Sequence, residues 1–324
     1  MSTPHPGIHP DDEAAILDSI ERWLAREVRP VAEKLEHDDI YPIQLVEQMK
    51  ELGLFGATIS PEFGGLGLPA STYTRIVALI SETWMSLTGI FNSHIMMATV
   101  VEKFGTQAQK EYWLPKFCAG EIRGGLGLTE ADAGTDLQAI RTRATRTDRG
   151  TYIVNGTKTW LSNGIEGGAV ALLVKTDPEA QPRHKGMSML IAPKVDPDNG
   201  QRYEGFRTGK KLEKLGYKGI DSAELIFEDY ELDAERHLVG GIEGKGFLMA
   251  VGGLELGRIN VASRAVGIAR RALKESVAYA QTRKTFGKPI GEHQAIQLKL
   301  GEMATKVRAA ELLVQDAAAA YDRG

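Results

Sequence analysis

The chain has 324 residues, a net charge of −4, and 42% hydrophobic and 25% charged residues. This is the composition of an ordinary globular protein that is large enough for two or three domains. The slight acidic excess argues against a general nucleic-acid-binding surface, which needs clustered positive charge. A single cysteine, Cys118, excludes an internal disulfide framework and a multi-thiolate metal site. It follows an apolar helical pattern, so we expect it to be a buried packing residue.

The first residues, MSTPHPGIHPDDE, are acidic and rich in proline. They have neither the apolar centre of a signal peptide nor the arginine-rich pattern of an organellar presequence. No apolar run in the chain approaches the length of a membrane span. We therefore expect a cytoplasmic protein without membrane insertion or a nucleic-acid partner.

The first third of the chain has the apolar spacing of helices. Helices are predicted over residues 11–35, 43–52, 71–105 and 106–118, with a break in the third near Thr88-Gly89. This predicts an all-helical domain over residues 1–122. No metal site is expected at His94, since no second ligand lies at a suitable spacing.

From residue 123 to residue 240 the pattern changes to short strands separated by Gly, Pro, Asp and Asn. Strands are predicted over residues 141–145, 152–154, 170–175, 187–192 and 223–227. Strands of this length and spacing are typical of a small β-barrel or sandwich. The basic segment Arg207–Lys218 has two interpretations that stay open: a solvated edge strand, or a surface that attracts phosphates.

The last part, residues 241–324, is again helical. Residues 247–282 and 291–321 form two predicted helices, which we expect to be antiparallel around a turn at Gly287–Pro289. The predicted fold class is therefore α+β, with a helical domain, a central β domain and a C-terminal helical bundle.

Two segments of the β domain suggest a ligand site. Gly124–Asp136, GGLGLTEADAGTD, opens into small residues that let a backbone approach a ligand closely. Lys158–Gly164, KTWLSNG, contains an indole, a hydroxyl and a turn dipeptide. Strand pairing would bring Thr129 and Ser162 near one another beside Trp160. Two hydroxyls and a flat apolar wall suit the ring of a flavin.

Three segments in the same order resemble the acyl-CoA dehydrogenase family of flavoproteins. LTEADAGTD resembles its first signature, KTWLSNG its flavin-flanking segment, and Arg283–Val307, RKTFGKPIGEHQAIQLKLGEMATKV, its C-terminal segment. The likeness runs from about residue 12 to residue 324. It implies the cofactor FAD, an acyl-CoA substrate, an electron-transfer flavoprotein as acceptor, and a homodimer or homotetramer. The short- and medium-chain-like branch fits best, with a C-terminal bundle that is only about half present.

The resemblance also implies roles for individual residues. Leu128 and Thr129 would contact the pyrimidine side of the flavin, Ser162 would face its N5 atom, and Trp160 would pack on the ring. Arg283, Phe286 and Gln294 would hold the FAD of a neighbouring subunit. Arg suits phosphate because its planar group donates two parallel hydrogen bonds. Without the motifs, Thr129 would be read as a strand end and Trp160 as a core residue.

The substrate side of the implied site is less sharply defined. Gly134 and Thr135 would contact the CoA part of the ligand. Met96 and Met97 either fill gaps in a helical core or line the acyl pocket, and both roles can hold together. Arg258 either supports the catalytic carboxylate or extends from the bundle surface into solvent.

The catalytic base is where the pattern departs from the family. Some members have a Glu at the position of Gly257, and most others have one in a C-terminal segment that would follow residue 324. Glu255 lies about 200° around the helix from Gly257, so we expect it to be structural or solvated. We expect the base beyond residue 324, and little activity in a chain that ends there.

The predicted function is the FAD-dependent α,β-dehydrogenation of an acyl-CoA thioester. A carboxylate would take the α-proton while the β-hydrogen leaves as hydride to the flavin. Two alternatives remain: a flavin monooxygenase or acyl-CoA oxidase on the same fold, and a non-catalytic binding protein that lacks the base.

Overall fold

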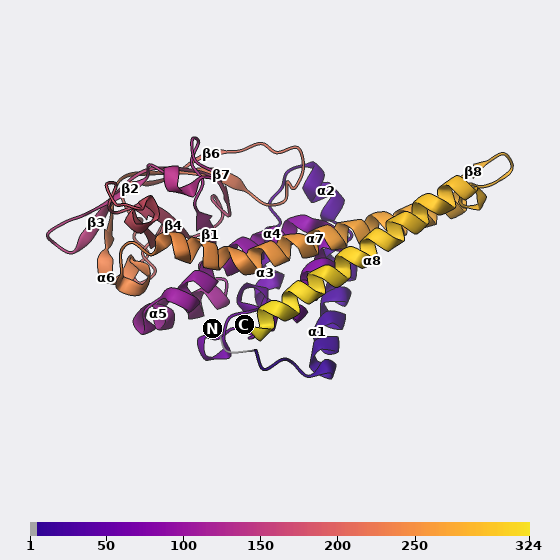
Figure 1. Cartoon of the computed structure of the whole chain (residues 1–324), viewed down its shortest axis with the longest axis horizontal. Coiled ribbons are helices and arrows are strands. Elements are labelled where there is room, and N and C mark those ends of the chain that lie inside the picture. Colours follow the sequence, from indigo (N-terminus) through magenta and orange to yellow (C-terminus); the bar gives the residue numbers. More distant parts are fainter. Residues whose placement is uncertain (1–4) are drawn as a thin grey trace. The chain divides into compact units, whose positions relative to one another are not determined.

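The computed structural model describes residues 5–324 and contains an N-terminal helical part, a β part and a C-terminal helical part (Figure 1). The helices are α1 (Pro10–Trp23), α2 (Ala32–His37), α3 (Ile43–Glu51), α4 (Ala70–Phe104), α5 (Gln107–Cys118), α6 (Ala234–His237), α7 (Gly246–Thr282) and α8 (Gln294–Arg323). The strands are β1 (Gly124–Gly127), β2 (Arg143–Arg146), β3 (Thr151–Ser162), β4 (Ala169–Lys175), β5 (Met187–Pro193), β6 (Phe206–Lys211), β7 (Ser222–Asp233), β8 (Lys284–Thr285) and β9 (Lys288–Pro289). The predicted fold class is confirmed.

The chain divides into two compact units. One unit comprises residues 1–34, 68–88 and 258–324, and the other comprises residues 35–67 and 89–257. We call them the helical unit and the β unit. The long helices α4 and α7 contribute to both.

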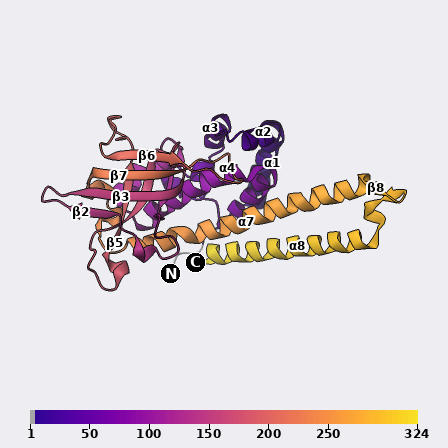
Figure 2. The same cartoon turned by 90° about the horizontal axis from the view of Figure 1, so that it is seen from above.

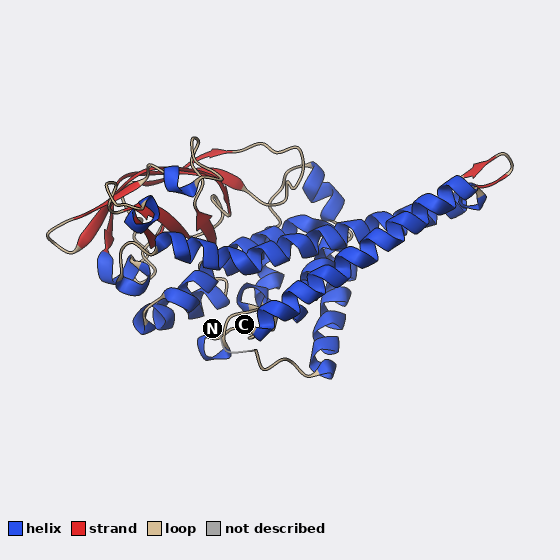
Figure 3. Ribbon diagram, in the orientation of Figure 1, coloured by secondary structure: helices blue, strands red, loops and turns tan. Residues whose placement is uncertain are grey.

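The β unit is built around a seven-stranded sheet with the order β1-β4-β2-β3-β7-β6, in which β5 pairs with the other side of β4. Strand β4 is buried on both faces, and its side chains alternate between two apolar cores. Ala171 and Leu173 lie in the core shared with helices α4 and α5. Val170 and Leu172 lie in the second core, together with residues of β2, β3 and β7. Figure 3 shows the strands in red. β6 is an edge strand with exposed basic residues, which fits one of the two open interpretations of this segment.

The break in α4 lies at a different residue from the predicted one. Trp84 has extended dihedrals (φ −157°, ψ 106°), whereas Gly89 continues the helix. A glycine costs a helix only about 1 kcal/mol, which packing can offset. Here the glycine makes room: a Cβ at residue 89 would lie 1.7 Å from the Tyr217 hydroxyl.

In the helical unit, the C-terminal part of α7 and helix α8 lie side by side and antiparallel, and the short β8–β9 hairpin joins them (Figures 1 and 2). Both helices leave apolar side chains exposed. Val277, Leu298 and Leu313 are 38%, 69% and 71% exposed.

Candidate functional site

The two segments predicted to bind a ligand meet at one corner of the sheet in the β unit. Strand β1 ends at Gly127 and continues into Leu128-Thr129-Glu130. The backbone N–H of Thr159 in β3 donates to the Thr129 carbonyl oxygen at 2.9 Å. The segment from Leu128 to Glu130 is therefore fixed beside residues 158–160, as the strand pairing predicted.

Trp160 lies in a β-bulge that turns its side chain outward. Lys158 pairs with Leu225 and Leu161 with Ala223, so β3 has one residue more than β7 in this interval. The backbone of Trp160 is left-handed (φ 60°), which is rare for a bulky residue. Its side chain is 58% exposed, whereas Trp23, Trp84 and Trp113 are at most 7% exposed. A strained backbone that exposes an indole is typical of a binding surface.

A buried ion pair lies next to this corner. The side chain of Lys158 is completely buried, and its Nζ donates to the Leu128 carbonyl oxygen (3.0 Å) and to Glu130 Oε1 (2.8 Å). Burial lowers the pKa of Lys158 to about 8, although the neighbouring carboxylate opposes this. Burial would raise the pKa of Glu130, but Lys158 and the hydrogen bonds from Thr142 and Arg141 outweigh it and lower the pKa. The sequence did not predict this pair, because nothing in it indicates that Lys158 and Glu130 lie in contact.

Ser162 and Asn163 follow the bulge at the end of β3. Asn163 is also left-handed (φ 59°), a conformation that Asn adopts more readily than most residues. Its buried Nδ2 donates to the carbonyl oxygens of Ile90 and Gly124, both at 2.9 Å. A Cβ at residue 125 would lie 2.9 Å from the Ser162 carbonyl oxygen, so Gly125 permits this close approach.

The residues predicted for the substrate side lie in the same unit. Gly134 and Thr135 are exposed in the turn after Glu130. Met97 is completely buried in the core, which is the packing alternative, whereas Met96 is partly exposed. A Cβ at residue 257 would lie 2.3 Å from the Met96 sulfur, so Gly257 and Met96 pack in direct contact.

The two charged residues considered near the base are both exposed. Glu255 pairs with Lys103 at 3.8 Å, which fits a structural carboxylate. Arg258 is exposed, so it matches the solvated alternative and not a buried one. The buried arginine of α7 is instead Arg264, which donates to Asn260 Oδ1 at 2.6 Å. The sequence around Arg264 did not indicate that this side chain is buried.

The residues predicted to hold FAD of a neighbouring subunit lie at the tip of the helical hairpin. Arg283 and Gln294 are exposed on either side of β8–β9. Phe286 is 96% exposed and left-handed (φ 51°). An aromatic side chain held in solvent by a strained turn is positioned for contact with another molecule.

Two further features belong to packing. His94 Nε2 lies 2.9 Å from the Phe117 carbonyl oxygen, and burial lowers the pKa of His94 to about 3, so its ring is neutral. Among residues 5–324, no group of three His, Cys, Asp or Glu residues is arranged to hold a metal ion. Cys118 is buried, as expected, and burial raises its pKa to about 12.

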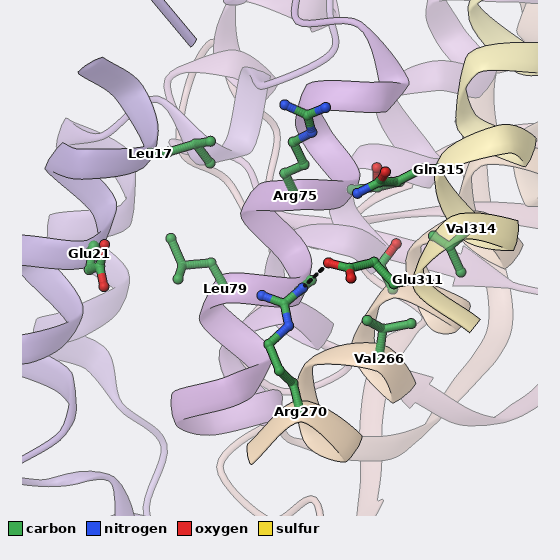
Figure 4. Close-up of a pocket in the computed structure, with 12 residues that line it drawn as sticks. Leu17, Glu21, Arg75, Leu79, Val266, Arg270, Glu311, Val314 and Gln315 are labelled. Carbon is green, nitrogen blue, oxygen red and sulfur yellow. Dashed lines mark hydrogen bonds and ion pairs between the residues drawn. The ribbon is translucent and has the colours of Figure 1, made fainter. Parts of the chain in front are cut away.

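The helical unit contains a cavity of about 300 Å³ between α1, α4, α7 and α8 (Figure 4). Three of its charged groups are paired: Arg270 contacts Glu82 and Glu311, and Arg75 contacts Glu13. The described residues that line it include none of those predicted for the flavin or the substrate. We therefore assign it no part in the site.

Comparison with known proteins decides the family. Models of the N-terminal, middle and C-terminal domains of acyl-CoA dehydrogenases match residues 10–121, 125–230 and 244–324. The chain belongs to the acyl-CoA dehydrogenase family. It is an enzyme of the class that carries out FAD-dependent α,β-dehydrogenation of acyl-CoA thioesters.

Individual relatives agree with this assignment. Acryloyl-CoA reductase (NADH) of Anaerotignum propionicum is 37% identical over 96% of this chain and 77% of its own length. The human mitochondrial short-chain specific acyl-CoA dehydrogenase is 34% identical over 97% of this chain and 73% of its own. The structure of butyryl-CoA dehydrogenase from Megasphaera elsdenii is similar with a TM-score of 0.90 at 32% identity, covering 98% of this chain and 81% of that one.

These matches refine the sequence predictions in part. The assignment to the family and the likeness to short-chain members are confirmed. Among the described residues, no helix is long and apolar enough to cross a membrane. A cytoplasmic location and the position of the catalytic base stay predictions.

Proposed function

We propose that the corner formed by Leu128, Thr129, Trp160 and Ser162 binds the ring system of FAD. The observation that carries this proposal is the outward-facing, left-handed Trp160 in a bulge beside the Thr129 segment. The site fits a flavin: an exposed indole offers a flat wall, and two neutral hydroxyls offer polar contacts to the ring edge. When bound, FAD supplies the acceptor for the hydride.

The chain's own residues would orient and enclose the reactants. The hydroxyls of Thr129 and Ser162 would fix the ring by hydrogen bonds, and the indole of Trp160 would shield one part of it from water. Gly134 and Thr135, exposed beside Thr129, would contact the CoA part of the substrate. The carboxylate that takes the α-proton is not assigned to a residue.

We further propose a short-chain acyl-CoA as the substrate. Supporting this are the relatives named as short-chain and butyryl-CoA dehydrogenases. The direct contact of Met96 with Gly257 also fills space between α4 and α7. Electron-transfer flavoprotein is the proposed acceptor, and the proposed assembly is a homodimer or homotetramer in which Arg283, Phe286 and Gln294 reach a neighbouring FAD.

The proposal is tested by titrating the purified chain with FAD and then with butyryl-CoA under anaerobic conditions. FAD binding should quench the emission of Trp160. Trp160→Phe should therefore reduce the FAD-induced quenching more than Trp23→Phe does. Bleaching of the flavin absorption by butyryl-CoA would demonstrate dehydrogenation and exclude a non-catalytic protein. Bound flavin without bleaching would support the flavin site and favour the non-catalytic alternative. Absence of FAD binding would overturn the proposal.

One alternative is separated by dioxygen. A flavin oxidase or monooxygenase on the same fold would reoxidise its reduced flavin rapidly in air. A dehydrogenase that delivers electrons to electron-transfer flavoprotein should react with dioxygen slowly. Chemical reduction followed by stopped-flow mixing with oxygenated buffer distinguishes the two and does not require the base.

A further inference from the structure

Lys158 is an unusual residue for the centre of a strand, because its side chain is completely inaccessible to solvent. An ammonium group removed from water is costly unless it is both paired and hydrogen-bonded. Here its Nζ has two partners on a single short segment, the Leu128 carbonyl oxygen at 3.0 Å and Glu130 Oε1 at 2.8 Å. These partners are the residues on either side of Thr129.

The Glu130 carboxylate extends the same contact to a third segment. It accepts hydrogen bonds from the backbone N–H of Arg141 (2.6 Å) and from the backbone N–H and hydroxyl of Thr142 (3.0 and 2.6 Å). The side chain of Glu130 is 10% exposed. One buried pair thus joins the segment that follows β1, the segment that precedes β2, and β3.

The pair also adjoins the strained bulge. Lys158 is the last residue in register before the bulge, and Trp160 follows two residues later. Strained conformations persist where surrounding contacts fix them. The Lys158 contacts and the Thr159 N–H bond to Thr129 fix the N-terminal side of this bulge, while the Asn163 amide fixes its C-terminal side.

A purely stabilising role explains this arrangement poorly. Replacing a buried ion pair by apolar residues of similar size is often neutral or stabilising, so such a pair is weak evidence for stability. What the pair provides is geometry: it sets the spacing between the Leu128–Glu130 segment and the bulge. That spacing is the width of the corner.

We propose that Lys158 and Glu130 are positioning residues, which hold Thr129 and Trp160 at the separation that a planar ring ligand requires. This inference rests on the proposed flavin site but concerns two residues that have no direct contact assigned to the ligand. They act through the Leu128 carbonyl group, the Thr129 backbone and the bulge.

The test compares Lys158→Met, Glu130→Gln and the double variant. Each single change leaves one buried charge without its partner, so the melting temperature should fall. The double variant leaves no unpaired charge and should recover most of that loss. Its affinity for FAD should nevertheless stay at least tenfold below that of the wild type. Lys103→Met, which removes a more exposed ion pair of the same unit, should change neither quantity.

A second readout needs no flavin. Trp160 is the exposed tryptophan among the four in the chain, so acrylamide quenching of the unliganded protein, corrected with Trp160→Phe, reports its surroundings. The double variant should change the quenching constant of Trp160. The inference would be overturned if the double variant had the quenching constant of the wild type and, provided that the wild type binds FAD, also its affinity for FAD. If the wild type fails to bind FAD, the proposed flavin site is wrong. The acrylamide quenching of Trp160 alone then decides whether the Lys158–Glu130 pair positions Trp160.

Discussion

At the scale of a single residue, Trp160 combines two properties that selection for stability alone would not favour. Its left-handed backbone costs a side chain of this kind about 1–2 kcal/mol, and 58% of the residue is exposed. Trp160→Asn should therefore leave the free energy of unfolding unchanged or raise it by about 0.5–1 kcal/mol, because Asn accepts this conformation more readily. The same change should weaken FAD binding at least tenfold. Urea denaturation and FAD titration measure the two effects.

The control for this prediction is the completely buried Trp113. Trp113→Ala should cost about 3–5 kcal/mol, as expected for a large core side chain. If Trp160→Asn proved comparably destabilising, Trp160 would be a packing residue, and its exposure would have another explanation.

Asn163 is the second residue on which the corner depends. Asn163→Asp replaces the amide that donates to the Ile90 and Gly124 carbonyl oxygens by a carboxylate that only accepts. The change should cost about 2 kcal/mol or more, since two buried acceptors lose their partner. Burial raises the pKa of such a carboxyl group in the folded state, so the unfolded state releases its proton first and stability falls as pH rises. Urea midpoints should therefore show a larger loss at pH 8 than at pH 5.

Asn199→Asp is the matched control for that measurement. Asn199 is exposed, and its side-chain oxygen accepts from the Gln201 backbone, which an Asp can do equally well. Equal pH dependence in both variants would contradict the assigned role of the Asn163 amide.

At the scale of helices, two glycines should respond in opposite directions to the same substitution. Gly267 of α7 packs against α4 so closely that a Cβ would lie 2.3 Å from the Ala78 carbonyl oxygen. Gly267→Ala should cost about 1–3 kcal/mol through overpacking. Gly301 of α8 has no atom within 4 Å of its Cβ position, so Gly301→Ala should stabilise by about 0.5–1 kcal/mol. Thermal unfolding distinguishes them, and equal signs would contradict the observed packing.

The last turn of α8 caps the first turn of α4. The Asp322 carboxylate accepts from the backbone N–H groups of Ala70 (2.6 Å) and Ser71 (3.0 Å), two donors that a helix start leaves unpaired. Asp322→Ala should therefore cost about 1 kcal/mol. Asp316→Ala, at an exposed position of the same helix, should change the urea midpoint little. Equal effects of the two variants would mean that the cap contributes nothing.

At the scale of the whole molecule, the sequence predicted the order of helical and β regions because apolar periodicity depends on local geometry. It also predicted that the Thr129 segment lies beside the segment of Trp160, and the hydrogen bond between Thr159 and Thr129 agrees with this. It did not reveal the Lys158–Glu130 pair, the left-handed Trp160 or the buried Arg264. Each depends on neighbours distant in sequence: Lys158 reads as a solvated strand residue until the fold supplies Leu128 and Glu130. The break at Trp84 was missed for the same reason. The sequence suggested a break at Gly89, but this glycine makes room for Tyr217, which is distant in sequence.

The shared cofactor site is the last prediction and concerns the assembly. If Trp160 of one subunit and Arg283 of its neighbour serve the same FAD, each site combines residues from two chains. Trp160→Asn and Arg283→Ala should each weaken FAD binding in a homo-oligomer.

When the two variants are unfolded together and refolded as a mixture, half of the dimers should be mixed. Each mixed dimer has one site with both residues intact, so about a quarter of all sites should regain wild-type affinity. Titration with FAD measures that fraction, and refolding each variant separately is the control. No recovery in the mixture, with mixed dimers verified by mass spectrometry, would show that Arg283 does not serve a neighbour's site.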